Sequence, residues 1–154
     1  MPYGVAVDGA HVYWADPDGN ALKRRALSSL GTDVLAEVVT AEPGPRDLAL
    51  DATRVYWLTA GGAVRARAKD LSANAVTLAT QQTGAESIIV DDRYVYWTTF
   101  VKSGTVSRVA KTGGLVEVLA GGQKNPYALT QDCTTVYWTN QNDFNTGEIM
   151  RVSK

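Results

Sequence analysis

The chain has 154 residues, enough for one domain with a hydrophobic core, and its 15 Lys and Arg residues nearly balance its 16 Asp and Glu residues. A balanced surface gives no broad electrostatic attraction to nucleic acid or to an anionic membrane, so we expect neither as a partner. One cysteine, Cys133, excludes an intrachain disulfide, and one histidine, His11, argues against histidine-rich metal sites and a catalytic triad. We therefore predict no catalytic residue, no metal and no cofactor.

The elements that the sequence predicts are short strands, which recur in the same order along the chain. In the first unit we expect strands at residues 3–8, 11–16, 21–27 and 33–40. These segments are rich in β-branched and aromatic residues and are bounded by Gly, Pro, Asp and Asn, as is typical of strands joined by turns. No segment shows a sustained apolar stripe at the helical period. The later units repeat the pattern at 46–51, 54–59, 63–69 and 74–80, at 86–91, 94–99, 105–111 and 114–120, and at 127–132, 135–140 and 148–154.

The triplet Val-Tyr-Trp marks the repeat, because it occurs at intervals of about 40 residues and contains every tryptophan of the chain. An aspartate precedes each triplet by the same distance, and we expect its carboxylate to close the turn by accepting backbone N–H bonds. We assign the units to residues 2–44, 45–84, 85–125 and 126–154 of one domain that spans 1–154. The structural repeat residues are Trp14, Trp57, Trp97 and Trp138, with Asp8, Asp51, Asp91 and Asp132.

The triplet also indicates how the strands pack. Successive side chains of a strand point to opposite faces, so the valine and tryptophan share one face and the tyrosine takes the other. Both faces are apolar and must be covered, which a β-propeller achieves because each four-stranded antiparallel blade packs between two neighbours. We predict an all-β propeller of about four blades, with the tryptophans as spacers between blades.

The strand count bears on ring closure, because the last unit lacks its outer strand. The strands would suit a small closed ring with one thin blade. An open arc or half-ring would expose apolar faces at both ends, so we expect it to close by self-association, as a dimer of arcs, or to pair with the remainder of a longer chain. The unpaired edge of the last blade could also accept a foreign strand.

The units resemble the Tyr-Trp-Thr-Asp propellers of lipoprotein-receptor type and the related NHL-like propellers of bacterial secreted proteins. The matching segments are "DGAHVYWAD", "DATRVYWLT", "DDRYVYWTT" and "DCTTVYWTN". The resemblance implies a propeller fold and a secreted or periplasmic protein, although the N-terminus lacks the basic start and apolar run of a signal peptide. The chain departs from the pattern because only the first unit keeps the closing aspartate, Asp16, and because such propellers usually have about six blades.

Candidate binding residues lie where the units differ while the scaffold repeats. The starts of the first strands carry Tyr3, Arg46, Glu86 and Tyr127. The longest loop between second and third strands, 139–147, contains Asn142, Asp143 and Phe144. This composition suits a polar ligand, such as a sugar or a peptide, and equally suits a solvated turn.

Three functions are compatible with these patterns. The first is a non-enzymatic binding or scaffold module that recognises a protein or a polar ligand, such as a carbohydrate, through loops on one face. The second is a propeller fragment or an engineered repeat protein with a purely structural role in assembly. The third is a metal-dependent lyase or lactonase of the propeller type, for which Glu86, Asp47 and Asn142 would be the candidate residues. We favour the first.

Overall fold

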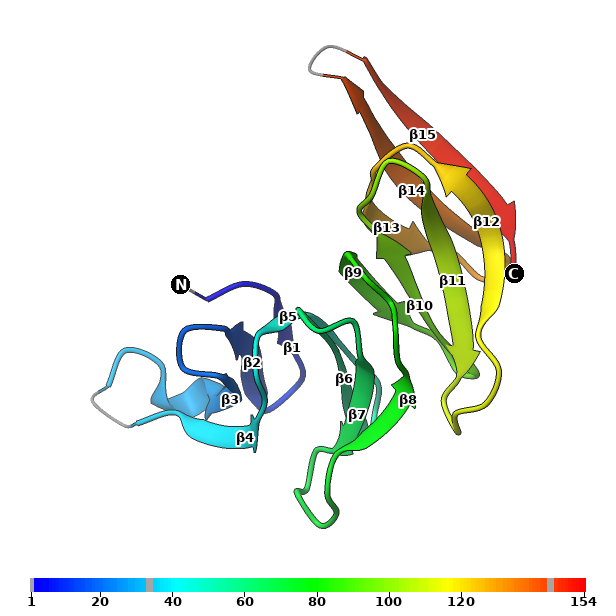
Figure 1. Ribbon diagram of the computed structural model, residues 1–154. Helices are drawn as coiled ribbons and strands as arrows, with labels where there is room; N and C mark the ends of the chain where they lie inside the picture. The colour runs from blue at the N-terminus through cyan, green and yellow to red at the C-terminus, as the bar shows by residue number, and fades with distance from the viewer. Residues whose placement is uncertain (1, 33–34, 144–145) are drawn as a thin grey trace.

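The computed structural model describes residues 2–32, 35–143 and 146–154 (Figure 1). In this part of the chain, four antiparallel sheets follow one another, three with four strands and one with three, and we call them blades 1 to 4. Blade 1 contains β1 (Val5–Val7), β2 (His11–Asp16), β3 (Ala21–Ala26) and β4 (Glu37–Ala41), and η1 (Leu27–Ser29) follows β3. Blade 2 contains β5 (Pro45–Leu50), β6 (Arg54–Thr59), β7 (Val64–Ala68) and β8 (Val76–Ala79). Blade 3 contains β9 (Ala85–Val90), β10 (Tyr94–Thr99), β11 (Gly104–Ala110) and β12 (Glu117–Gln123), and blade 4 contains β13 (Pro126–Gln131), β14 (Thr135–Asp143) and β15 (Thr146–Ser153).

The repeated aspartates close the turns between the first and second strands. In blade 2, Oδ1 of Asp51 accepts the backbone N–H groups of Thr53 at 2.8 Å and Arg54 at 2.7 Å. Such a carboxylate holds a tight turn by satisfying donors that the strands leave unpaired. The same pair of bonds occurs at Asp8, Asp91 and Asp132.

The core lies between the blades, and its pattern repeats from one blade to the next. In each case the tryptophan of the later blade belongs to the same apolar cluster as the tyrosine of the earlier blade. The pairs are Trp57 with Tyr13, Trp97 with Tyr56, and Trp138 with Tyr96. All three tryptophans are buried, whereas Trp14 of blade 1, which has no earlier blade beside it, is half-buried. The tryptophans therefore act as spacers between blades.

The blades form an open arc with the first strand of each blade on its inner side (Figure 1). This confirms the expected all-β arc of four antiparallel blades with three strands in the last, and it excludes the small closed ring. The predicted loop at 139–147 is wrong in part, because β14 continues to Asp143 and β15 begins at Thr146. β14 and β15 form one long antiparallel pair, whose ladder pairs Gln141 with Gly147.

Candidate functional site

The starts of the inner strands meet at one place. Tyr3 lies just before β1, Arg46 lies in β5 and Glu86 lies in β9, so the three residues come from three blades. The Tyr3 hydroxyl donates to Oε1 of Glu86 at 3.1 Å, and the Arg46 guanidinium binds Oε2 at 2.7 Å. Glu86 is only 8% exposed, and a buried carboxylate of this kind is stable only when it is paired. Glu86 therefore joins the first three blades at the inner side of the arc.

A second row of residues lies one position further along the same strands. Asp47 spans two blades, because its Oδ1 accepts the N–H of Leu48 at 2.9 Å and its Oδ2 accepts the N–H of Ile88 at 3.0 Å. Burial raises the pKa of Asp47, and these backbone donors partly offset the rise. Gly4 packs so closely here that a Cβ atom would lie 2.5 Å from the Asp47 carboxylate. Only glycine allows this approach of blade 1 to blade 2.

The two rows border a cavity of about 240 Å³, which we call the inner-strand site. A neighbouring hollow of about 310 Å³ shares Tyr3 with it and is also lined by Arg46. Because the two hollows adjoin at Tyr3, a ligand larger than one cavity could contact both. The residues that line the inner-strand site are Tyr3, Gly4, Asp47, Glu86, Ser87, Tyr127 and Ala128.

Aromatic side chains border the site and remain accessible. Tyr3 is 53% exposed and Tyr127 is 39% exposed, and the ring of Phe100 meets Tyr127 edge-on at 5.5 Å between centroids. The hydrogen bond from Tyr3 to Glu86 and the charge of that carboxylate raise the pKa of the Tyr3 hydroxyl above its usual value. Tyr3 therefore stays neutral and keeps donating to Glu86 through the physiological range. The site combines a fixed carboxylate, a guanidinium and two exposed aromatic rings.

The structure thus gathers four of the residues that the sequence singled out, Tyr3, Arg46, Glu86 and Tyr127. The other three are not placed with them. Phe144 lies outside the described residues, and the side chains of Asn142 and Asp143 are not described either. Their backbone belongs to the end of β14, beyond Asn140, which pairs with Pro126 at the start of β13.

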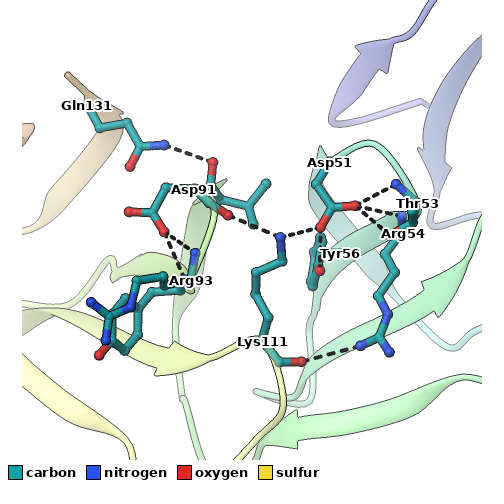
Figure 2. A network of polar contacts seen from close by, with 10 residues as sticks. Asp51, Thr53, Arg54, Tyr56, Asp91, Arg93, Lys111 and Gln131 are labelled. Carbon is teal, nitrogen blue, oxygen red and sulfur yellow. Dashed lines mark hydrogen bonds and ion pairs between the residues drawn. The ribbon is translucent and has the colours of Figure 1, made fainter. Parts of the chain in front are cut away.

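A second set of polar contacts crosses between blades at the opposite ends of the inner strands. Figure 2 shows one of them, in which Lys111 of blade 3 reaches Oδ2 of Asp51 in blade 2 at 2.5 Å and the carbonyl oxygen of Asp91 at 3.2 Å. The Tyr56 hydroxyl donates to the same Asp51 oxygen at 2.8 Å. Sequence analysis missed the lysine, although it ends the third strand in "AVRARAK", "TVSRVAK" and "EIMRVSK".

Within the described residues, no group of three or more His, Cys, Asp or Glu side chains could hold a metal ion. Glu86 and Asp47, two of the residues considered for a metal-dependent enzyme, already accept the hydrogen bonds given above. No helix in the described part of the chain combines the length and the apolar character that crossing a membrane requires.

Comparisons with known proteins address the fold. No family model and no curated protein matches the sequence. A chain of the nidogen/laminin complex superposes with a TM-score of 0.80 at 19% identity, over 97% of this chain and 60% of that one. The computationally designed Ika4 protein gives 0.76 at 14% identity, over 99% of this chain and 91% of that one. The fold is that of a β-propeller.

The propeller similarity extends to proteins of different kinds. The virginiamycin B lyase from Staphylococcus aureus superposes with a TM-score of 0.71 at 14% identity, over 96% of this chain and 54% of the lyase. The chain therefore spans little more than half of the lyase and 60% of the nidogen-complex chain. At these identities the similarity shows the fold alone, because propellers support many unrelated functions.

Proposed function

We propose that this propeller arc is a non-enzymatic binding module that takes a polar, hydroxyl-rich ligand at the inner-strand site. One observation carries the proposal. The side chains at one repeat position whose residue type varies between units border one cavity or its adjoining hollow; they are Tyr3, Arg46, Glu86 and Tyr127. A scaffold that repeats while one row varies is the arrangement expected of a recognition surface.

The chemistry of the site favours a neutral ligand over an ion. Arg46 already balances the charge of Glu86, so the pair offers hydrogen-bond donors and an acceptor without a net charge. The exposed rings of Tyr3 and Tyr127 provide apolar faces on which a sugar or a similar polyol can stack. A carbohydrate therefore fits this combination better than an anion or a cation.

The proposal is tested by titrating the labelled chain with a panel of mono- and oligosaccharides and following backbone NMR shifts. We expect one sugar class to shift signals of residues around the inner-strand site, and Tyr127→Ala to weaken its binding at least tenfold, since one stacking ring is lost. Tyr137→Ala, in the same blade but away from the cavity, is the matched control. Equal loss in both variants, or no shift at the site with any sugar, would overturn the proposal.

The alternative function is a structural role in assembly, and it rests on the similarity to a designed propeller. The match over 91% of the designed Ika4 protein supports an engineered repeat protein, whereas the match over only 60% of the nidogen-complex chain supports a piece of a larger propeller. In that case the sugar panel gives no binding, and the partner of the arc is another blade, from a second copy or from further chain. The lyase or lactonase alternative would instead require stoichiometric divalent-metal binding together with turnover that Glu86→Gln abolishes.

A further inference from the structure

The three interfaces within the arc share one polar arrangement. In each, the lysine at the end of the third strand of the later blade reaches the turn aspartate of the earlier blade. The ion pairs are Lys69 with Asp8 at 2.9 Å, Lys111 with Asp51 at 2.5 Å (Figure 2) and Lys154 with Asp91 at 3.1 Å. The same ammonium groups lie 5.7 to 5.8 Å from the ring centroids of Tyr13, Tyr56 and Tyr96. An interface of this type therefore needs an aspartate and a tyrosine on one blade and a lysine on the next.

Blade 4 presents the aspartate and the tyrosine without a lysine. The Tyr137 hydroxyl donates to Oδ2 of Asp132 at 2.8 Å, as its counterparts do in blades 2 and 3. Among the described residues, no cationic side chain pairs with Asp132. Lys154 and Arg93 line a hollow of about 620 Å³ together with Asp132, but the ion pair of Lys154 is with Asp91.

The apolar part of the same face is also uncovered. Ile149 in β15 is 81% exposed, whereas the residues at its position in blades 1, 2 and 3 (Leu22, Val64 and Val106) are at most 1% exposed. Each of those three belongs to a cluster with the tryptophan of the following blade. On blade 4 an apolar hollow of about 210 Å³ remains at this position, lined by residues that include Tyr137, Trp138 and Ile149. We call this surface, with Asp132 at its end, the Tyr137 face.

A second copy of this chain supplies only half of the matching surface. Its blade 1 carries the half-buried Trp14, flanked by the exposed Val5 and Val7. At the position that Lys69, Lys111 and Lys154 occupy in the other blades, however, blade 1 has Leu27. Docking of a second copy would therefore cover Asp132 and Tyr137 with an aliphatic side chain, which removes water from the carboxylate without replacing its hydrogen bonds.

We propose that the Tyr137 face binds a propeller blade of a non-identical partner, which presents a tryptophan to the hollow beside Ile149 and a third-strand lysine to Asp132. The tryptophan supplies the buried apolar area, and the lysine selects the partner, because its absence leaves a desolvated carboxylate unpaired. The partner thus differs from a second copy at one position, where it has a lysine and this chain has Leu27.

The chain itself provides the probe for a direct test. The probe carries Leu27→Lys, which installs the missing lysine on blade 1, and Ile149→Arg, which blocks its own Tyr137 face. The receptor carries Val5→Arg, which blocks its own blade 1 and leaves its Tyr137 face intact. Sedimentation velocity with a labelled probe gives the affinity of the pair, and thermal melting checks that each variant is folded.

We expect the Leu27→Lys probe to bind about five- to tenfold more tightly than the same probe with Leu27, as for a partly desolvated ion pair. The gain should vanish on a receptor with Asp132→Asn and persist on one with Asp92→Asn. A Leu30→Lys probe adds the same charge on the loop after η1 and should show no gain. Equal binding by the Leu27 and Leu27→Lys probes, an equal gain with Leu30→Lys, or no binding by any probe would each overturn the proposal.

Discussion

The turn aspartates of blades 1, 2 and 3 perform two tasks with their two carboxylate oxygens. In blade 3, Oδ1 of Asp91 accepts the backbone N–H groups of Arg93 and Tyr94, and Oδ2 accepts the Tyr96 hydroxyl and pairs with Lys154. Burial alone would raise the pKa of Asp91, but these four donors outweigh it and lower the pKa to about 2. One side chain therefore closes a turn within its blade and binds the next blade.

Asp91→Asn should lower the free energy of unfolding by about 1–3 kcal/mol, because the amide cannot pair with Lys154 and leaves buried donors poorly satisfied. Urea denaturation of the variant and of the parent chain measures the difference. Asp92→Asn is the matched control, since Asp92 is adjacent and exposed, and its effect should stay within about 0.5 kcal/mol. Similar losses in the two variants would contradict the role assigned to Asp91.

The same carboxylates predict how stability depends on pH. The pKa of Asp91 is about 2 in the folded chain and 3.8 as an ordinary aspartate, so the folded state binds its proton less readily. The stabilisation is therefore complete above about pH 4 and is lost as the pH falls toward 2. Urea midpoints measured from pH 6 to pH 2 should fall steeply in this window, and Asp91→Asn should make the fall shallower. A profile unchanged by the substitution would count against this assignment.

At the scale of the element, each blade is defined by the aromatic side chains that its second strand presents on its two faces. The tryptophan faces the earlier blade and the tyrosine faces the later one, so every internal interface pairs the same two aromatic residues. The ends of the arc depart from this rule. Trp14 and Tyr137 face outward, and both are only half-buried.

Trp97→Ala should therefore cost about 3–5 kcal/mol of unfolding free energy, because it leaves a cavity in a fully buried interface. Trp14→Ala removes the same side chain from the uncovered face of blade 1 and should cost less than half as much. Thermal or urea denaturation of both variants tests the comparison. Equal losses would show that Trp14, at the blade 1 end of the arc, is covered as completely as Trp97 in the middle.

Gly104 packs tightly against its own blade and against Pro126 of blade 4. A Cβ atom at this position would lie 2.1 Å from the carbonyl oxygen of Thr99 and 2.5 Å from Cδ of Pro126. We expect Gly104→Ala to destabilise the chain by about 1–3 kcal/mol, because backbone and a proline ring cannot move aside easily. Gly9→Ala, at a turn with open space around the added methyl group, should change stability by less than about 0.5 kcal/mol. A smaller loss at Gly104 than at Gly9 would refute this account.

At the scale of the whole molecule, the arc leaves an apolar face at each end. Val5 and Val7 are exposed on blade 1 and Ile149 is exposed on blade 4, and contiguous faces of this kind are generally found in interfaces. Between them, the inner-strand site depends on residues from all four blades. The site and the Tyr137 face adjoin at Ala128, which lines both hollows, but their other lining residues differ.

In the absence of another partner, we expect the purified chain to associate weakly through these end faces. Light scattering after gel filtration should give an apparent mass that rises with protein concentration and is not reduced by salt, because the contact lacks the lysine ion pair. Ile149→Arg should return the mass to that of one chain. A single-chain mass at every concentration would contradict the expected association, and a mass that salt reduces would contradict a contact without an ion pair.

The sequence by itself determined the repeat, the all-β class, the four units and the burial of both faces of the Val-Tyr-Trp strand. These features are local: strand alternation and turn chemistry act over a few residues and recur in each unit. It also pointed to Tyr3, Arg46, Glu86 and Tyr127 as the row that varies. Only the tertiary structure decided that Glu86 joins Tyr3 to Arg46, that lysines bridge successive blades, and that β14 runs to Asp143 and pairs with β15. Those contacts depend on how far each blade is rotated from the last, which no single repeat encodes.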